Sequence, residues 1–345
     1  MKIQVSAKNQ AYAFDCGPDE KILHAGLRSA IALPYECGTG TCGTCKARLH
    51  EGNVRNGWPE APGQKYLKHE RDVLMCQSLP LGDCALEVST AVTPMVGASV
   101  PAALDGAIRQ CAMLTHDVMM LDVELSRPLA FEAGQFMLVS APGIAGGRAY
   151  SMVNFESVTE RLVFVVKKKP DGRMSEWLFG GSVEGTRVGL FGPLGAATFH
   201  PDVSKNVLCI AGGSGIAGMM SILARAVQER YFDRFTGEVF FGVRTPRDVF
   251  FLDELADFQS RSPDGLRVTI ALSDEDVDPA LEARYPRFGF GRGFVHAVAG
   301  PGMRGRFGNV RAYVAGPPPM VDATLRMLLL EGKLRRDDIR YDKFS

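Results

Sequence analysis

Four cysteines in the first part of the chain have the spacing of an iron–sulfur site. Cys37, Cys42 and Cys45 follow the pattern C-x4-C-x2-C, and Cys76 follows at a distance. This is the plant-type ligand pattern of a [2Fe–2S] cluster, which four thiolates hold. A zinc site usually pairs two C-x2-C units, and this stretch has one. Cys84 is the rival for the fourth position, but it opens an expected strand, so we favour Cys76.

Glycines separate the first three cysteines and suit a loop that wraps tightly around a cluster. Gly38, Gly40 and Gly43 let the backbone approach sulfur and present N–H groups to it. Such hydrogen bonds help to set a reduction potential. A C-x2-C redox pair would require neither Cys37 nor these glycines. The remaining cysteines are expected to be buried small hydrophobes: Cys16, Cys84, Cys111 and Cys209.

A second motif has the residue types that hold a flavin. Arg148, Ala149, Tyr150 and Ser151 follow an expected strand and a Gly-rich loop. An arginine can hold a pyrophosphate bidentately, a tyrosine can stack on a flat ring system, and a serine hydroxyl can reach a ring nitrogen. Alone, the motif also fits a surface turn, so its position between the cysteine module and a nucleotide-type unit carries the prediction.

Two further stretches are expected beside the flavin. One is a turn whose small groups and N–H donors suit phosphate. The other is the end of a strand, where Lys167, Lys168 and Lys169 follow one another. Only Lys167 continues the inward alternation of the strand, and the other two fit a solvent-exposed strand end. The expected ligands are Gly172, Arg173, Met174 and Ser175 in the turn and Val166 and Lys167 in the strand.

A glycine-rich turn between an expected strand and helix is suited to the pyrophosphate of a dinucleotide. Gly218 completes a formal G-x-G-x-x-G spacing there. The Rossmann fingerprint also requires an acid at the end of the next strand, where this chain has Arg244. The Rossmann prediction therefore fails one test, although a pyrophosphate site remains. The turn consists of Gly212, Gly213, Ser214 and Gly215.

The last expected strand of this unit ends in a second glycine- and proline-rich string. Gly316, Pro317, Pro318 and Met320 lie between that strand and a helix. They belong on the carboxyl edge of the parallel sheet, where open α/β folds bind ligands. Together with Arg244, they complete the expected nicotinamide site.

Hydrophobic periodicity divides the chain into three expected domains. Residues 1–92 form a small β-rich module, 93–104 a linker, 105–203 an antiparallel β-barrel, and 204–345 an α/β unit with a parallel sheet. Expected strands cover 2–7, 12–16, 45–49, 85–89, 119–125, 135–140, 162–167, 187–191, 206–211, 238–243, 266–272 and 310–315, and expected helices cover 21–30, 219–229 and 320–331.

Charge and hydropathy exclude some partners. The 345 residues include 39 basic and 39 acidic side chains, so net charge gives no reason to expect nucleic acid. No stretch approaches the about 18 apolar residues of a membrane span, and the N-terminus lacks an apolar signal region. We expect a cytoplasmic monomer without membrane contact, in a compartment where grouped cysteines bind metal.

In this order, the motifs resemble the reductases of multicomponent bacterial aromatic-ring oxygenases. In that family a plant-type ferredoxin is fused to a ferredoxin–NADP reductase-like unit. The likeness spans essentially the whole chain and is closest to the reductases of carbazole dioxygenase, a Rieske system, and toluene 4-monooxygenase, a diiron system. It is carried by the strings at 33–37, 58–63, 148–152, 211–216, 315–322 and 341–344.

The resemblance implies a β-grasp fold for the ferredoxin module, FAD on the second motif and the turn at 172–175, and NADH on the two glycine strings. It also implies that Ser151 orients flavin N5 and that Phe344 shields the flavin ring until nicotinamide displaces it. Two positions depart from the family. Ala315 stands where many members have a cysteine near the nicotinamide, and Gly218 stands where a proline often ends the turn.

Cofactor preference follows from the residues after the third strand of the nucleotide unit. Family members that use NADPH often have Ser-Arg there, whereas this chain has Ser273, Asp274 and Glu275. Two carboxylates would repel a 2′-phosphate, which favours NADH. Arg244 and Arg247 argue weakly in the other direction.

The resemblance implies a chain of electron transfer from NADH through FAD and the [2Fe–2S] cluster to a terminal oxygenase or its ferredoxin. A flavin accepts two electrons and releases them singly, which is why the three parts belong together. The six histidines are scattered and form no oxygenase iron site. A Rieske partner is favoured over a diiron partner. A deoxysugar-pathway reductase and a non-catalytic redox sensor remain alternatives.

Overall fold

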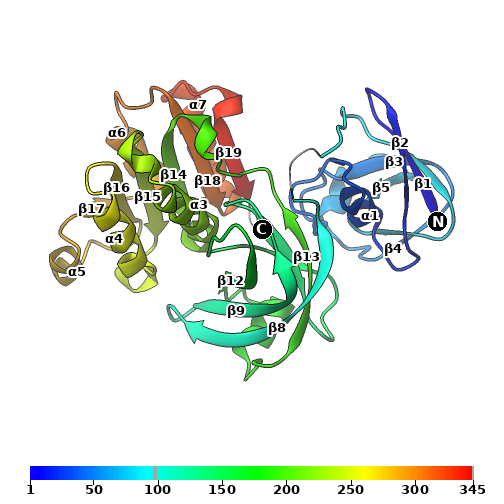
Figure 1. Ribbon diagram of the computed structural model, residues 1–345, viewed down its shortest axis with the longest axis horizontal. Coiled ribbons are helices and arrows are strands. Elements are labelled where there is room, and N and C mark those ends of the chain that lie inside the picture. The colour runs from blue at the N-terminus through cyan, green and yellow to red at the C-terminus, as the bar shows by residue number, and fades with distance from the viewer. Residues whose placement is uncertain (96–98, 344–345) are drawn as a thin grey trace. The chain divides into compact units, whose positions relative to one another are not determined.

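A computed structural model describes residues 1–95 and 99–343. Phe344 lies outside them. The chain forms two compact units (Figure 1), and the middle part of the sequence contributes strands to both. The first unit comprises Met1–Asp105, Phe136–Ala149 and Val188–Leu194, and the second comprises Gly106–Gln135, Tyr150–Arg187 and Gly195–Ser345.

The N-terminal part of the first unit is a mixed sheet with one helix, as in a β-grasp module. The strand order is β2-β1-β7-β3-β5. β1 pairs parallel with β7, and the remaining pairs are antiparallel. The bounds are β1 Lys2–Ser6, β2 Ala11–Asp15, α1 Ile22–Arg28, β3 Lys46–Glu51, β5 Asp72–Leu74 and β7 Cys84–Glu87, with a separate pair formed by β4 Val54–Asn56 and β6 Ser78–Pro80.

The helix α1 fixes the position of the strand that precedes Cys76. Ile22, Leu23 and Leu27 are buried in the core of the module. The backbone N–H of Leu23 donates to the carbonyl of Met75 at 3.1 Å. The packed helix α1 therefore holds Met75, the residue before the expected cluster ligand Cys76.

The alternation expected at the N-terminus is also present, since β1 buries only Ile3 and Val5.

The first unit also contains two strands from the middle of the chain. β10 (Phe136–Ser140) pairs antiparallel with β13 (Arg187–Leu194). Phe136, Leu138, Phe191 and Leu194 belong to the same apolar cluster as the core of the N-terminal module. These strands therefore share one core with the cysteine module.

The second unit contains long antiparallel strands and a parallel sheet. β8 (Ala102–Met113) and β9 (Val118–Leu129) form a hairpin, and β9 pairs with β12 (Thr159–Lys167). The short helix α2 (Arg173–Phe179) follows β12. β8 begins within the stretch expected to be linker, at Ala102.

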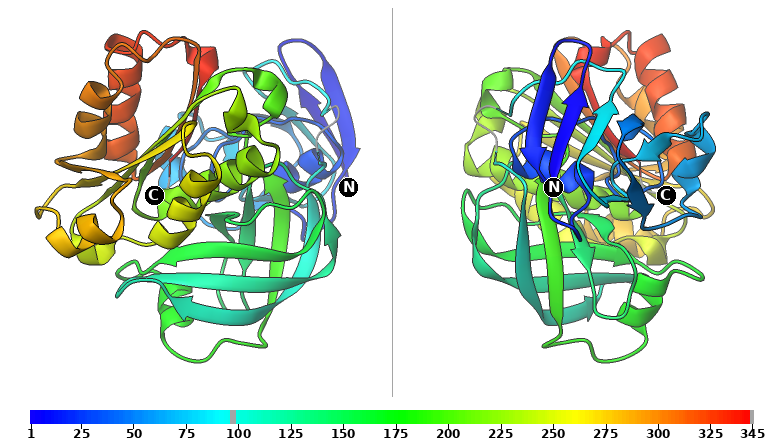
Figure 2. Two further views of the ribbon diagram at one scale, coloured as in Figure 1. Left: turned by 60° about the vertical axis from the view of Figure 1, so that its left-hand side comes forward. Right: turned by 90° about the vertical axis from the view of Figure 1, so that its right-hand side faces the viewer.

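The parallel sheet has six strands in the order β17-β16-β15-β14-β18-β19. Figure 2 shows helices on both of its faces. On one face, α6 and α7 cover Leu208 and Ile210 of β14. The bounds are β14 Asn206–Gly212, α3 Ile216–Gln228, β15 Gly237–Val243, α4 Leu252–Arg261, β16 Leu266–Leu272, α5 Pro279–Arg284, β17 Gly289–Arg292, α6 Val295–Gly302, β18 Val310–Gly316, α7 Pro318–Leu330 and β19 Ile339–Lys343.

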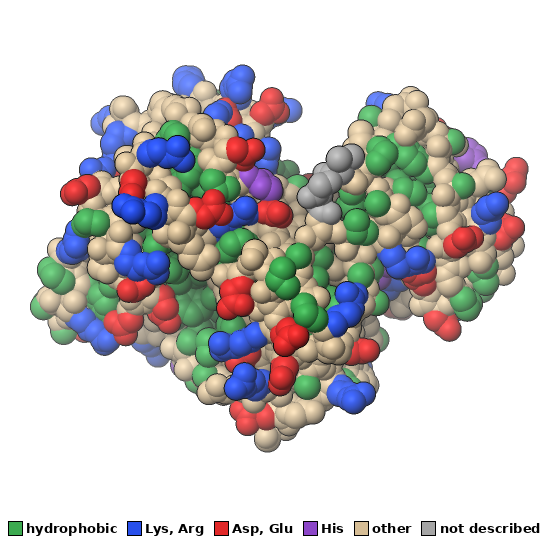
Figure 3. All heavy atoms as spheres, viewed as in Figure 1, with side chains coloured by type: hydrophobic (Ala, Val, Ile, Leu, Met, Phe, Trp, Pro, Cys, Tyr) green, Lys and Arg blue, Asp and Glu red, His purple; other side chains and the backbone are tan. Residues whose placement is uncertain are grey.

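The expected balance of charge and the expected lack of a membrane span can both be compared with the structure. Figure 3 shows acidic and basic side chains interspersed over the face in view, in keeping with equal numbers of each. Among the helices within residues 1–95 and 99–343, none is long and apolar enough to cross a membrane.

Candidate functional site

The cysteine loop places N–H groups around sulfur, as its glycines predict. The Cys37 Sγ accepts hydrogen bonds from the backbone N–H groups of Thr39 and Cys42, both at 3.4 Å. The Cys42 Sγ accepts one from Thr44 at 3.5 Å. Gly40, with φ of 96°, makes the left-handed turn between the first two cysteines. The loop is thus shaped to surround its sulfurs with donors.

The four thiols lie in two close pairs. The Sγ atoms of Cys45 and Cys76 are 3.1 Å apart and buried. A hydrogen bond from the Cys42 thiol lowers the pKa of Cys37 to about 3. The same bond raises the pKa of Cys42, and the bond with Cys76 raises that of Cys45. Two thiols for each of two irons is the donor set of a Cys-ligated [2Fe–2S] cluster, so these residues fit the group.

The rival Cys84 lies in β7 and has other partners. Its thiol donates to the carbonyls of Asn53 at 3.5 Å and Gly82 at 3.4 Å, and burial raises its pKa. Cys16 and Cys209 are also buried, as predicted. The prediction is wrong for Cys111, which is only partly buried. It lies near the end of β8, where buried and exposed side chains no longer alternate.

One residue beside the cysteines was missed by sequence reasoning. The side-chain amide of Gln77 donates to the carbonyl of Thr39 at 2.9 Å and lies 3.8 Å from the Cys76 Sγ. It ties the loop to the strand end that carries the fourth cysteine. A polar residue directly after that cysteine was the only signal available in the sequence.

The flavin motif forms the strand β11 (Arg148–Ser151), which passes from the first unit to the second after Ala149. In the first unit, the Arg148 guanidinium donates to the Gly147 carbonyl at 3.1 Å. In the second unit, Ser151 is buried and the Tyr150 ring lies 6.4 Å from the ring of Phe164. The motif is therefore part of a strand rather than a surface turn.

The two other flavin stretches have well-defined local structure within the second unit. Gly172 precedes α2, and the Ser175 Oγ lies 2.9 Å from the Gly172 carbonyl and accepts from the Lys169 N–H at 3.0 Å. Arg173 and Met174 form the first turn of that helix. The Lys167 amine is paired with Asp117 at 2.9 Å, beside the buried Val166. The other two lysines, Lys168 and Lys169, are exposed, as predicted.

The glycine turn and the second glycine string meet at the carboxyl edge of the parallel sheet. A Cβ on Gly215 would lie 2.2 Å from the carbonyl oxygen of Ala315, so only glycine fits. A Cβ on Gly212 or Gly316 would contact the Met320 side chain. Gly213 and Ser214 complete the turn before α3, while Pro317 and Pro318 begin α7. Residues about a hundred positions apart therefore form one backbone cradle.

The second unit also brings the flavin serine to the nucleotide turn. A Cβ built on Gly218, in the first turn of α3, would lie 3.4 Å from Ser151 Cβ and 3.5 Å from its Oγ. These are ordinary van der Waals distances. The strand of the flavin motif and the helix after the nucleotide turn are therefore close neighbours.

The acidic turn after β16 is fixed by backbone hydrogen bonds. Ser273 N–H donates to Val243 at 3.1 Å, and Asp274 N–H donates to Arg244 at 2.9 Å. Arg292, on β17, donates to the Asp274 carbonyl at 3.0 Å and pairs with Asp276 at 3.2 Å. The turn therefore lies beside Arg244 at the carboxyl edge of the sheet.

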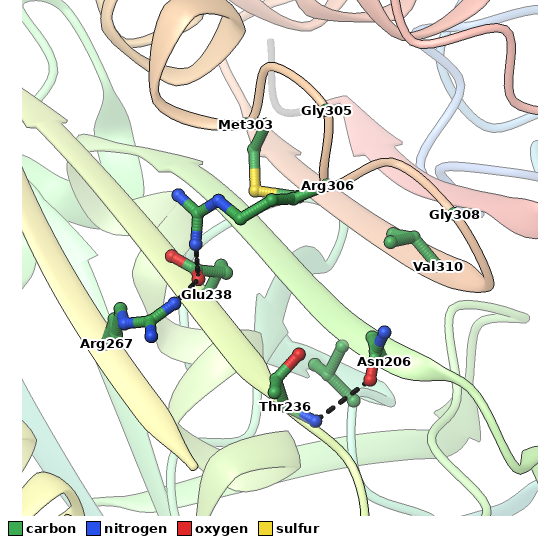
Figure 4. A pocket seen from close by; sticks show the side chains of 10 residues that line it. Asn206, Thr236, Glu238, Arg267, Met303, Gly305, Arg306, Gly308 and Val310 are labelled. Carbon is green, nitrogen blue, oxygen red and sulfur yellow. Dashed lines mark hydrogen bonds and ion pairs between the residues drawn. The ribbon is translucent and has the colours of Figure 1, made fainter. Parts of the chain in front are cut away.

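A cavity of about 270 Å³ lies at the opposite, amino-terminal edge of the same sheet (Figure 4). There the buried carboxylate of Glu238 accepts from Arg267 at 3.0 Å and from Arg306, and the Asn206 side chain accepts from the Thr236 N–H at 2.9 Å. No expected site residue lines it. The ion pairs already satisfy its buried charge.

Comparisons with known proteins divide the chain as the motifs do. A 2Fe-2S iron-sulfur cluster binding domain matches residues 5–81, an oxidoreductase FAD-binding domain 105–199, and an oxidoreductase NAD-binding domain 209–326. The fold and the site thus define a nicotinamide-dependent oxidoreductase that uses FAD and a [2Fe–2S] cluster. The expected fold class and cofactors are confirmed.

Relatives match over nearly the whole chain. The ferredoxin–NAD(P)+ reductase CarAd of Metapseudomonas resinovorans is 37% identical, covering 95% of this chain and 96% of its own. The ferredoxin–NAD+ reductase component of the alkene monooxygenase system of Xanthobacter autotrophicus is 32% identical, covering 97% and 99%. The solved structure of the ferredoxin reductase in carbazole 1,9a-dioxygenase has a TM-score of 0.85 at 34% identity, covering 100% and 99%. The chain belongs to the family of electron-transferring reductase components of multicomponent oxygenase systems.

Proposed function

We propose that this reductase passes electrons from NADH to the terminal oxygenase of an aromatic-ring dioxygenase system, or to its ferredoxin. The contact between Ser151 and Gly218 carries the proposal, because it joins the flavin motif to the nucleotide turn within one unit. A dioxygenase partner of the Rieske type is favoured by the 37% identity to the reductase CarAd and the likeness to the carbazole 1,9a-dioxygenase reductase. Relatives named for alkene and phenol monooxygenases support a diiron partner as the second candidate.

The proposed cluster ligands are Cys37, Cys42, Cys45 and Cys76. Support comes from the two close thiol pairs and from the different hydrogen-bond partners of Cys84. The backbone donors around Cys37 would stabilise negative charge on its sulfur. We propose domain boundaries after residues 92, 104 and 203, which the matched ranges support.

The proposed flavin and nicotinamide ligands include Ser151 of β11 and the turn before α3, which lie close together at Gly218 within the second unit. When bound, FAD would accept two electrons from the nicotinamide and release them one at a time. Arg148 would hold the pyrophosphate, Tyr150 would stack on the ring system, and Ser151 would hold a hydrogen bond to flavin N5. Phe344, outside the described residues, would cover the ring. The remaining proposed ligands are Ala149, Val166, Lys167, Gly172, Arg173, Met174, Ser175, Gly212, Gly213, Ser214, Gly215, Arg244, Gly316, Pro317, Pro318 and Met320.

The central experiment is anaerobic addition of NADH to the purified protein. We expect the visible absorbance of both the flavin and the cluster to bleach, because hydride transfer and single-electron transfer follow one another. Failure of both bleaching steps would contradict the proposal. Bleaching of the flavin alone would contradict the proposed route through the cluster.

Cofactor preference is tested in the same assay with NADPH. The carboxylate of Asp274, held at the carboxyl edge of the sheet, would repel a 2′-phosphate. We expect Asp274→Ser to narrow the preference for NADH over NADPH by about tenfold, equal to about 1.4 kcal/mol. Asp257→Ser, on the exposed side of α4, is the matched control. A wild type that prefers NADPH would refute the argument.

We also propose that the protein is cytoplasmic and monomeric. A reducing compartment suits a chain whose cysteines, all within the described residues, form no disulfide with one another. Cell fractionation and sedimentation of the holoprotein test the two statements. Recovery outside the cytoplasm, or a sedimenting dimer at micromolar concentration, would contradict them.

A further inference from the structure

Lys21 lies directly before helix α1 in the first unit, where its charge does not suit the helix. Residues at this position usually accept hydrogen bonds from the first N–H groups, and a cation there opposes the helix dipole. The Lys21 side chain makes no such hydrogen bond, and the first turn of α1, which is described in full, contains no acid. A local rule of helix stability is therefore broken at Lys21, which points to another use of its charge.

The two acids that precede Lys21 are paired with arginines instead. The Glu20 carboxylate lies 2.8 Å from the Arg28 guanidinium, and the Asp19 carboxylate lies 3.5 Å from that of Arg55. Within the described part of the chain, no carboxylate forms an ion pair with the Lys21 amine. Its positive charge is therefore available to other groups nearby.

The start of α1 holds Lys21 beside the buried pair of cysteines. The Leu23 N–H donates to the carbonyl of Met75, the residue before Cys76, at 3.1 Å. Cys45 and Cys76 are fully buried, and Lys21 is half-buried. Burial lowers the pKa of Lys21, whereas charge on the sulfurs of Cys76 and Cys45 raises it. The amine is therefore within electrostatic reach of two proposed cluster ligands.

Lys21 is also within electrostatic reach of the flavin motif. The charge of Arg148, the first residue of β11, adds to the lowering of the Lys21 pKa. Both residues belong to the first unit. A single cation therefore interacts with the proposed cluster ligands and with a proposed flavin ligand.

A charge at this place affects the energy of reduction. Each electron that enters a [2Fe–2S] cluster adds one negative charge, and a partly buried cation stabilises that charge more than a cation in water does. Cluster potentials depend on such local charge and on hydrogen bonds to the sulfurs. Backbone N–H groups supply the hydrogen bonds at Cys37 and Cys42. Lys21 supplies positive charge beside the other pair.

We propose that Lys21 tunes the reduction potential of the cluster, because its ammonium stabilises the reduced form and so favours electron transfer from the flavin. In this step the flavin loses one electron and the cluster gains it. No bond forms or breaks, and Lys21 keeps its proton. The inference rests on the proposed function, since it takes the four cysteines as the cluster ligands and the flavin as the electron donor.

The test is the midpoint potential of the cluster in the full-length holoprotein. It is measured by titration with dithionite and redox mediators and followed by the EPR signal of the reduced cluster. We expect Lys21→Gln to lower the equilibrium constant for reduction about fivefold, which corresponds to about 40 mV for one electron. Lys21→Arg keeps the charge and should retain the wild-type potential. Lys8→Gln, in the exposed β1–β2 turn, is the matched control and should also retain it.

The visible spectrum shows whether each variant retains its cluster. If Lys21→Gln loses it, Lys21→Met, which keeps an apolar stem, gives the same comparison. Equal potentials in the uncharged Lys21 variant and in Lys8→Gln would overturn the proposal. Loss of the cluster from both uncharged variants would also overturn it, because a charge that only tunes the potential is not needed to hold iron.

The same titration separates this inference from the proposed function. Dithionite replaces NADH as the reductant, so the measured potential does not depend on hydride transfer. A wild type that NADH fails to bleach would overturn the proposed function, whatever the potentials of the Lys21 variants.

Discussion

The cysteine loop and the nucleotide turn are both glycine-rich, but they are built differently. Cys37, Cys42 and Cys45 lie in one loop, so the spacing along the chain already describes most of the site. The turn at 212–218 obtains its shape from β18, whose Ala315 carbonyl leaves no room for a side chain at Gly215. The cysteine spacing is therefore encoded locally, whereas the shape of the glycine turn depends on the register of the parallel sheet.

The largest expected effect tests the local encoding. Cys76→Ser should abolish the visible absorbance of the cluster, because its sulfur lies 3.1 Å from that of Cys45. Cys84→Ser, the control, should retain the absorbance because Cys84 bonds to Asn53 and Gly82. The absorbance spectrum of the purified variants is the measurement. Retention in Cys76→Ser with loss in Cys84→Ser would reverse the assignment.

The next effect tests the dependence on the sheet. Gly215→Ala places a Cβ 2.2 Å from the Ala315 carbonyl oxygen, and the backbone must move to relieve the clash. We expect the free energy of unfolding to fall by about 3 kcal/mol and the KM for NADH to rise. Urea unfolding and steady-state kinetics measure the two quantities. An unchanged KM together with unchanged stability would show that β18 does not shape the turn.

A smaller effect concerns His24, a partly buried histidine on α1 of the cysteine module. The His24 ring stacks on Phe191 at 3.9 Å, and its Nε2 is buried without a hydrogen-bond partner among the described residues. Burial, with a smaller contribution from the charge of Lys21, lowers the pKa of His24 to about 3, and Glu20 opposes the shift. The neutral ring is therefore the form that the folded protein holds.

The sign of the pH dependence follows from proton uptake. Below the unfolded pKa of about 6.5, the unfolded chain binds a proton that the folded chain does not, so acid favours unfolding until the pH falls to about 3. Between pH 7 and pH 5 this costs about 2 kcal/mol of stability. His24→Phe should remove that loss, and His69→Phe at an exposed position should not. Thermal unfolding at the two pH values distinguishes them, and parallel losses in wild type and His24→Phe would contradict the assignment.

The smallest effect has the opposite sign. A Cβ on Gly218 would meet only ordinary contacts, the nearest at 3.4 Å from Ser151. Gly218→Ala should therefore stabilise α3 by up to about 1 kcal/mol, because alanine loses less backbone entropy in a helix. Urea unfolding beside Gly215→Ala gives the comparison directly. A loss of stability would mean that the contact with Ser151 is tighter than the structure indicates.

The motifs and most of the elements that carry them are predictable from the amino-acid sequence. Long apolar strands such as β14 and β16 were predicted nearly to the residue because a buried parallel strand is a continuous apolar run. β17 and β19 were missed because they contain glycine, arginine, lysine and aspartate at the sheet edges. α4 was missed because its polar residues obscure the apolar stripe that it buries.

Side-chain partnerships could not be read from the sequence. The amide of Gln77 and the ring of Tyr66 reach the cysteine loop only after β5 and the 3-10 helix Pro62–Tyr66 are in place. The contact of Ser151 with Gly218 likewise depends on how β11 and α3 pack. These contacts join residues that are far apart in the sequence, so no local pattern of residue types predicts them.

The acidic turn after β16 has an evolutionary consequence. Backbone hydrogen bonds from Ser273 and Asp274, with the Arg292 guanidinium on the Asp274 carbonyl, fix the path of the chain without the Asp274 carboxylate. The preference for NADH or NADPH can therefore change by substitution of one or two side chains in this turn, while the backbone of the turn stays the same. A lineage could change the pool of reducing equivalents on which it draws while the rest of the reductase stays as it is.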